Sequence, residues 1–267
     1  MFDKPTVKGD LSRSAKVQMR SIYALMIRDL MMRYGRDNIG FLWVVVEAMM
    51  LAVGVMIIWS VLRPSLEHGV SMIFMAFTGY LLLTMWRHFT QSGVGLFEQT
   101  SGLLYHRNVS ILDIFISRIF LEFAAMSASF VFIGAVLIDA NLIDPPHDLG
   151  TVVVGWLAMA ALAASVGLNL AVASEYSKTV ERFVGPIQYF LLPISGSFYM
   201  VYWLPTKLQN IAWFIPMVHC YEMVRGGFVG DAVVTYYTIW YPYLWAICLT
   251  CLGLWGLERV RSRIHLG

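Results

Sequence analysis

The sequence predicts an all-α integral membrane protein with six transmembrane helices. Hydrophobic residues make up 58% of the 267 residues and charged residues only 13%, which is typical of a chain surrounded mostly by lipid. Six apolar runs are also long enough to cross about 30 Å of hydrocarbon. These predicted spans cover about residues 40–62, 70–86, 111–138, 149–173, 183–203 and 239–257. Residues 40–257 would then form a single transmembrane domain.

A polar segment, residues 1–39, precedes the first span and lacks the short apolar core of a removable signal peptide. At 100° per residue, its apolar and basic residues gather on opposite faces of a helix. We expect an amphipathic helix on the membrane surface; a basic segment that only orients the chain is the alternative. The apolar face comprises Ala15, Met19, Ile22, Met26 and Leu30, and the basic face comprises Arg13, Lys16, Arg20 and Arg28.

The distribution of lysine and arginine predicts the orientation. Most of the 19 Lys and Arg residues fall in the N-terminal segment, in the C-terminal tail 258–267 or in the loops on the same face. By the positive-inside rule, both termini are cytoplasmic. The loop 139–148 has three acids and no Lys or Arg, as expected outside.

Two loops have unusual sequences. The cytoplasmic loop 87–110 is too long for a simple connection, and its apolar periodicity predicts a short helix that suits a soluble partner. The external segment 204–238 is too apolar for an exposed loop and too broken for a span. Prolines and glycines divide it into two short helical pieces, which predicts a re-entrant helical hairpin beside a wet pathway. The breaking residues are Pro205, Pro216, Gly226, Gly227 and Gly230.

The sequence contains no catalytic constellation. It has no Gly-x-x-x-x-Gly-Lys-Ser/Thr phosphate loop, so nucleotide energy must come from another subunit. The six histidines lack ligand spacing, which predicts no metal site. Ser195-Gly196-Ser197 near His219 lacks the Gly-x-Ser-x-Gly context of a hydrolase. We therefore predict a protein that is not an enzyme.

Charged and aromatic residues in the apolar runs are candidate functional residues, because an ionisable group in a span is costly. Arg118 and Glu122 are four residues apart, and Glu222 and Arg225 are three apart, so both are predicted structural charge pairs; substrate contact is the alternative. Glu47 lies in the first span. Five aromatic residues would suit a carbohydrate track, because sugar C–H faces stack on rings; an interfacial belt is the alternative. They are Tyr189, Phe198, Tyr199, Tyr202 and Trp203.

Three short blocks, in this order and at this spacing, carry a family resemblance. They are Arg33-Tyr34-Gly35-Arg36 before Gly40-Phe41-Leu42-Trp43, then Asn108-Val109-Ser110-Ile111-Leu112-Asp113 with Arg118 and Glu122, and then Ser195-Gly196-Ser197-Phe198-Tyr199 with Leu204-Pro205, Asn210, Pro216, His219, Glu222 and Arg225-Gly226. Over nearly its whole length, the chain resembles the membrane subunit of type-2 ABC exporters, specifically the capsular-polysaccharide export permeases of Gram-negative bacteria. The usual Glu-Pro of the first span is Glu47-Ala48 here, which puts a proline kink in doubt.

The resemblance implies a homodimer in the bacterial inner membrane, with two cytoplasmic ATP-binding cassette subunits that bind ATP and magnesium. The chain itself would hold no cofactor. The cargo would be a lipid-linked, often acidic capsular polysaccharide, passed to periplasmic and outer-membrane export proteins; no nucleic acid is expected. The N-terminal helix would be the interface helix, and the hairpin would lie on the periplasmic side. The coupling helix to the ATPase would include Phe97, Leu103, Leu104 and Tyr105.

The expected channel residues are Glu47 and the five aromatic residues. Basic residues at the inner mouth would attract an anionic glycolipid, since guanidinium pairs well with phosphate and carboxylate; orientation of the chain is the alternative role. They are Arg28, Arg33, Arg36 and Arg87.

Three other functions stay open. A related exporter would carry another cargo, such as an O-antigen glycolipid, a teichoic acid or a drug. A membrane enzyme would act on lipid-linked sugars without ATP. A secondary transporter would favour an internal repeat, which the two halves of the chain do not show convincingly.

Overall fold

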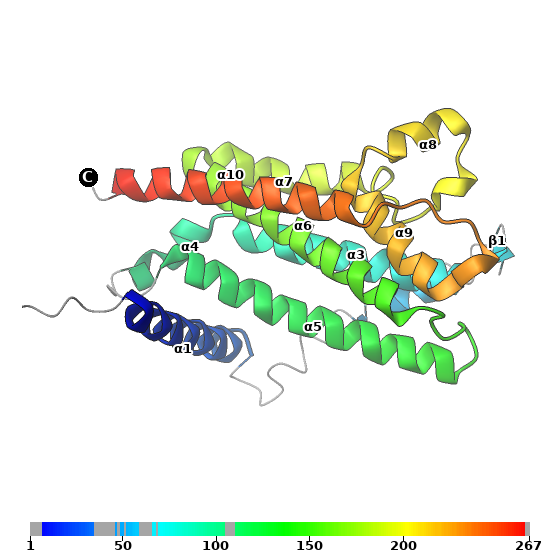
Figure 1. Cartoon of the computed structure of the whole chain (residues 1–267), viewed down its shortest axis with the longest axis horizontal. Helices are drawn as coiled ribbons and strands as arrows, with labels where there is room; N and C mark the ends of the chain where they lie inside the picture. The colour runs from blue at the N-terminus through cyan, green and yellow to red at the C-terminus, as the bar shows by residue number, and fades with distance from the viewer. Residues whose placement is uncertain are drawn as a thin grey trace, which may run out of the picture.

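The protein is an elongated bundle of helices that run roughly along one axis (Figure 1). The computed structural model describes residues 7–34, 46, 49, 50, 52–58, 66, 67, 69–104 and 110–264. Its one sheet in these residues is a short antiparallel pair, β1 (Leu66–Glu67) and β2 (Val70–Ser71). The all-α class is therefore confirmed.

Three helices of the described residues are long and apolar enough to cross a membrane. They are α5 (Ile111–Asp139), α6 (Leu149–Tyr176) and the segment Trp240–Val260 of α10 (Trp240–Ile264). They match the third, fourth and sixth predicted spans, so the chain is a multi-pass membrane protein. The first predicted span lies largely outside the described residues, although residues 52–58 are helical. The total of six spans stays a prediction.

Helix α3 (Met72–Gly93) is the core of the bundle and is buried along most of its length. It covers the second predicted span, 70–86, except for its first two residues, which form β2, and it continues about two turns further than expected, into the predicted coupling loop. Its close contact with α6 depends on glycine: a Cβ atom built on Gly93 would lie 1.8 Å from the carbonyl oxygen of Gly167. The two backbones therefore touch directly near the end of α3.

The fifth predicted span, 183–203, is not one continuous helix. Helix α7 (Lys178–Leu191) has 14 residues, about 21 Å at 1.5 Å per residue, and turns occupy 192–198. Pro193 lacks the N–H of a helical residue, and Gly196 has φ +91°. The Ser195 and Ser197 hydroxyls both donate to the Leu192 carbonyl oxygen, which competes with helical bonding. The prediction of a span over 183–203 did not take the effects of Pro193, Gly196 and the two serine hydroxyls into account.

The segment after these turns contains two α-helices, in agreement with the two helical pieces that its sequence predicts, and two short 3-10 helices. Helix η1 (Val201–Trp203) leads to α8 (Thr206–Ala212) and α9 (Pro216–Val229), and η2 (Gly230–Ala232) follows. Pro216 starts α9, and Gly230 ends it with φ +56°. Gly226 and Gly227 were predicted to break the helix, and this prediction is wrong. They lie inside α9, where Gly227 allows close approach to the Asp148 carbonyl oxygen. The membrane depth of this segment stays a prediction.

The two described chain ends lie at the same end of the bundle. Helix α1 (Val7–Tyr34), the C-terminal end of α10 and α4 (Leu96–Leu104) are at one end, and α8, α9 and β1 are at the other (Figure 1). We call these the α4 end and the α9 end. The α1 helix packs against α5, with its Leu25 and Asp29 buried. Met19, predicted on the apolar face, is exposed, because the packed face is turned toward Leu25 and Asp29.

Helix α5 packs chiefly against α1 and α3 and only lightly against α6. Two apolar hollows of about 510 and 470 Å³ flank the line where α5 approaches α6. Both are lined by Phe115 and Ile116 of α5 and by Ala161 and Ala164 of α6. Small alanine side chains leave this space open. By contrast, α6 packs closely on α3, α9 and α10.

Candidate coupling network and substrate surface

A polar clasp joins α1 to the first turn of α5. Ser110 caps α5 in a reciprocal capping box with Asp113, in which each side chain accepts from the other residue's main-chain N–H. The other oxygen of the Asp113 carboxylate accepts a hydrogen bond from Gln18 Nε2 at 2.8 Å. The same carboxylate therefore fixes the start of α5 and binds α1.

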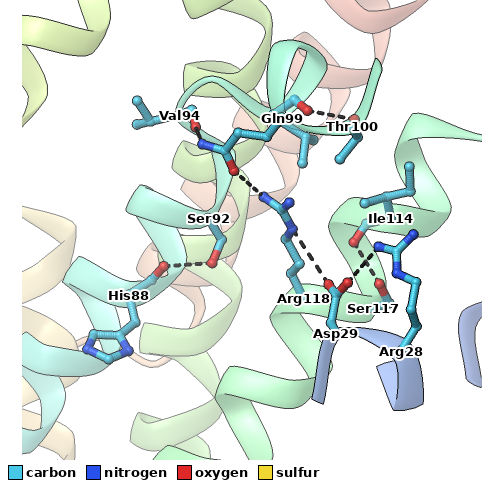
Figure 2. A network of polar contacts seen from close by, with 11 residues as sticks. Arg28, Asp29, His88, Ser92, Val94, Gln99, Thr100, Ile114, Ser117 and Arg118 are labelled. Carbon is cyan, nitrogen blue, oxygen red and sulfur yellow. Dashed lines mark hydrogen bonds and ion pairs between the residues drawn. The ribbon is translucent and has the colours of Figure 1, made fainter. Parts of the chain in front are cut away.

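One guanidinium group, that of Arg118 on α5, lies between α1 and α4 (Figure 2). Its Nε is 3.7 Å from the Asp29 carboxylate, and its Nη1 donates to the Gln99 side-chain oxygen at 3.0 Å. Arg28 also pairs with Asp29, at 2.6 Å. We call Asp29, Arg118 and Gln99 the coupling bridge, because they join three helices.

Apolar packing surrounds the coupling bridge. Leu25 of α1 belongs to a buried cluster that draws on α4, α5 and α6. The other buried members are Leu96, Ile114, Phe115, Leu168 and Ala171. On its far side, α4 is tied to α6 by the Gly95 N–H, which donates to Ser174 Oγ at 3.2 Å. Gly95 has φ +64°, so glycine suits the sharp turn from α3 into α4.

The residues predicted for the coupling helix fall in and just after α4. Phe97 is buried, so its side chain anchors α4 to the bundle instead of offering a surface to a partner. The side chains of Leu103 and Leu104, and the whole of Tyr105, lie outside the described residues. The same is true of the Arg33 side chain and of Arg36 and Glu47.

Arg118 and Glu122, predicted as one pair, have partners on other helices. Arg118 binds α1 and α4 as described above. The buried Glu122 carboxylate lies 2.9 Å from Nδ1 of His88 on α3. The two residues thus contribute to interhelical contacts along one side of α5.

Two predicted site residues that are distant in sequence lie together on the exposed side of α7. The Arg87 guanidinium lies over the Tyr189 ring, 5.2 Å from its centroid. Next to it, Gln188 Nε2 donates to Thr90 Oγ1 at 2.7 Å and ties α7 to α3. Tyr189 is 61% exposed, so the cation–π pair stands at the surface.

A buried arginine, Arg225 of α9, holds the turn after α7. The residue is fully buried, and its guanidinium donates to three main-chain carbonyl oxygens, those of Gly196, Ser197 and Tyr199, at 2.6–2.8 Å. Nε donates to Thr78 Oγ1 of α3 at 3.2 Å. Gly79 of α3 adds close contact, since a Cβ atom there would lie 2.1 Å from the Ser197 carbonyl oxygen. We call the segment 195–199 the Arg225 turn.

Glu222 binds main-chain groups on two other segments, and the predicted Glu222–Arg225 ion pair does not form among the described residues. Its two carboxylate oxygens accept from the N–H groups of Val201 and Tyr236, both at 3.0 Å. His219 accepts at Nδ1 from the Thr238 N–H at 3.0 Å, so its Nε2 donates to the Trp213 carbonyl oxygen at 2.9 Å. The polar residues of α9 therefore position the irregular backbone around it, and sequence spacing alone suggested a simpler pairing.

The predicted aromatic residues fall into two groups. Tyr189 lies with Arg87 on α7. Tyr199 belongs to the Arg225 turn, together with Phe198, and its hydroxyl donates to the Ile194 carbonyl oxygen at 2.9 Å. Tyr202 and Trp203 follow in η1 and contact each other edge to face, with centroids 5.9 Å apart. An exposed aromatic surface on α7 thus leads toward an aromatic turn at the α9 end.

Comparison with known proteins now assigns the family. The model of the family described as "ABC-2 type transporter" matches residues 20–229. The chain belongs to the ABC-2 type transporter family. This match covers α3 to α9 and most of the described part of α1, so the coupling bridge and the Arg225 turn both lie in the ABC-2 region. Membership makes the chain a transporter permease and not an enzyme.

The ABC-2 relatives include capsule export proteins. The chain is 36% identical over 252 residues to the capsule polysaccharide export inner-membrane protein BexB of Haemophilus influenzae, covering 94% of each chain. It is 37% identical over 247 residues to CtrC of Neisseria meningitidis serogroup B, which has the same description, covering 92% of this chain and 93% of CtrC. The polysialic acid transport protein KpsM of Escherichia coli is 20% identical over 251 residues, covering 94% and 97%.

Two polar residues of this ABC-2 protein escaped the sequence reasoning. Asp29 lies among basic residues on α1, and Gln99 lies in a loop chosen for its apolar periodicity. A signal existed for Asp29, because Gln18, Ile22, Leu25 and Asp29 are spaced four, three and four apart and share one helical face. An acid on the packed face of a surface helix calls for a buried partner. Its partner, Arg118, could not be identified without the fold.

Proposed function

We propose that this chain is the transmembrane, channel-forming subunit of an ATP-driven exporter of capsular polysaccharide across the inner membrane. The observation that carries the proposal is the 36% identity to capsule polysaccharide export proteins over 94% of the chain. Two copies of the chain would form the path, and two ATP-binding cassette subunits would bind ATP and magnesium. Periplasmic and outer-membrane export proteins would receive the polymer.

The α4 end faces the cytoplasm in this proposal. The lysine and arginine bias of the sequence supports this orientation, because the N-terminal segment and the C-terminal tail are both basic. The ATPase subunits would dock beneath α1 and α4. The α9 end, with its Arg225 turn and aromatic residues, would then face the periplasm.

The exposed face of α7 suits the path between two copies of the chain. Phe183, Ile187 and Phe190 are all more than half exposed on a helix whose opposite side, with Val184 and Gln188, is buried. Tyr189 and Arg87 lie at the edge of this face. Aromatic rings there can stack on sugar faces as the polymer passes, and the guanidinium of Arg87 can attract an acidic group of the polymer or its lipid-linked terminus.

Reconstitution tests the proposal. The chain, purified with an ATP-binding cassette subunit from the same cell, is placed in vesicles, and transfer of lipid-linked acidic polymer to the other side is measured. We expect transfer that requires ATP. Transfer driven by an ion gradient without ATP would indicate a secondary transporter. Conversion of the lipid-linked sugar without transfer would indicate a membrane enzyme.

The cation–π pair predicts a selective loss with acidic cargo. Replacing Arg87 by Gln should lower the export rate of acidic polymer about five- to tenfold, because a cation–π and charge contact of about 1 kcal/mol or more is removed. ATPase binding should be unchanged. Initial export rates with acidic and neutral polymers measure the effect, and Arg182→Gln, which removes an exposed charge at the start of the same helix, is the control. Equal loss for both polymers would contradict recruitment by charge.

The aromatic residues near the α9 end predict a dependence on the size of the cargo. The double replacement Tyr199→Ala and Tyr202→Ala should lower polymer export at least tenfold, because several rings contact a long chain at once. Export of a small amphipathic drug should change less than twofold. Comparing the two cargoes in the same vesicles checks this expectation. A drug exporter would show the reverse pattern.

A further inference from the structure

The coupling bridge raises the question of how α1 and α4 move relative to each other. Both helices lie at the α4 end (Figure 1), and both have polar contacts with the N-terminal part of α5. If an ATPase pushed α4 while α1 stayed behind, the contacts through α5 would have to break. The strength and direction of these contacts therefore decide whether the two helices move separately or together.

The apolar contacts would allow some sliding. The cluster around Leu25 and Leu96 joins α1 to α4, but hydrophobic contact has no preferred direction. A buried ion pair and a charged hydrogen bond differ, because each holds particular atoms opposite each other. Among the described polar contacts, the route from α1 to α4 runs through the Arg118 guanidinium.

Burial makes the α1–α5 half of the coupling bridge expensive to break, whereas the Arg118–Gln99 hydrogen bond to α4 is exposed. The Arg118 side chain is 13% exposed and the Asp29 side chain 9%, so water screens their attraction poorly. Separating the two would leave the buried Asp29 carboxylate with Arg28 as its remaining partner among the described ion pairs and would take a buried charge away from Arg118, which is unfavourable. Lys178 and Glu98, on the other side of α4, form an ion pair at 3.2 Å, but they are 75% and 66% exposed. An exposed pair of this kind holds helices together weakly.

We propose that α1, α4 and the first turns of α5 move as one rigid unit, and that Arg118 is the positioning residue that joins α1 to α4 in it. The inference rests on the proposed function, because the movement is that imposed by the ATPase subunits. Arg118 suits this role because its planar guanidinium faces two partners at once: Nε lies 3.7 Å from the Asp29 carboxylate, an ion pair longer than a hydrogen bond, and Nη1 donates to Gln99. The unit would transmit ATPase movement to α5 in one step.

Asp29, Arg118 and Gln99 form one chain of contacts, so replacements at the three residues should have related effects. Asp29→Asn breaks one contact of Arg118, and Gln99→Ala breaks the other. Because either change interrupts the same connection, each should lower the polymer exported per ATP hydrolysed about fivefold, and the double variant should be no worse than either single variant. Arg118→Gln should give the same loss. ATP hydrolysis and ATPase binding should stay within twofold of the unsubstituted complex.

A conservative variant separates bridging from charge. Arg118→Lys keeps a positive charge opposite Asp29 but offers a single nitrogen, so we expect normal stability with export per ATP still reduced. Lys178→Gln, which removes the exposed ion pair, is the matched control and should keep the normal ratio. All variants are measured in the complete complex in vesicles, with the thermal midpoint recorded for each.

Three results would overturn the inference. One is a parallel loss of ATP hydrolysis and export, which indicates a purely structural role. The second is a double variant, Asp29→Asn with Gln99→Ala, whose loss of polymer exported per ATP equals the product of the two single losses. The third is a normal ratio in Arg118→Lys. Failure of the proposed function would be distinct, because the unsubstituted complex itself would then export no polymer.

Discussion

Replacing Arg225 by Met should abolish polysaccharide export and lower the free energy of unfolding by about 3–5 kcal/mol. The guanidinium donates to the carbonyl oxygens of Gly196, Ser197 and Tyr199, and the buried turn has no other donor at hand for them among the described contacts. Methionine fills similar space but donates no hydrogen bond. The thermal midpoint of the purified protein and the export rate in vesicles measure both effects.

Two further variants show whether the geometry of Arg225 matters. Arg225→Lys should fail to restore export, because one ammonium group cannot reach three carbonyl oxygens spread along the turn. Thr78→Val removes only the Nε contact and should cost about 1 kcal/mol. Export at the normal rate in Arg225→Met would show that the Arg225 turn does not depend on this residue.

Replacing Gly93 by Ala should destabilise the protein by about 3 kcal/mol or more, at the upper end of the cost of overpacking. The new Cβ would lie 1.8 Å from the Gly167 carbonyl oxygen, and that atom belongs to the backbone of α6, which cannot rotate away. The helices must separate where α3 turns into α4. A fall of about 10 °C in the thermal midpoint is the expected measurement.

Gly185 of α7 provides the matched control, because a Cβ built there meets no atom within 4 Å. Gly185→Ala changes the same atom on a helix and should leave the thermal midpoint unchanged or slightly higher, since alanine favours the helix. Similar losses in the two variants would show that helix propensity, and not backbone contact, decides the result at Gly93.

The features of the fold that depend on neighbouring residues in the chain were predictable from the sequence. The apolar runs of α5, α6 and α10 give the spans, Pro216 starts α9 and Gly230 ends it, and the periodicity around Phe97 falls in the helix α4. Each of these features depends on neighbouring residues. The backbone conformation of residues 192–203 also depends on a distant residue, because Arg225, about 30 residues later, donates hydrogen bonds to the carbonyl oxygens of that turn. A hydropathy pattern contains no such information.

Polar partners were harder to predict for the same reason. Spacing along one helix favoured Arg118 with Glu122 and Glu222 with Arg225. In the structure, Arg118 binds Asp29 and Gln99, Glu122 binds His88, and Glu222 binds main-chain N–H groups. A buried charge takes the partner that best compensates its lost hydration, and this partner is often on another helix. The juxtaposition of Arg87 with Tyr189 likewise required the fold.

The light contact between α5 and α6 has a consequence for the role of the bilayer. Helix α6 is held in place by its tight packing against α3, α9 and α10. Helix α5, by contrast, borders two open apolar hollows on the side that faces α6. In a membrane, hydrocarbon chains are the solvent for such surfaces. On the side that faces α6, a movement of α5 would then displace fluid lipid instead of interlocked side chains, so the viscosity of the bilayer would contribute to the friction of that movement.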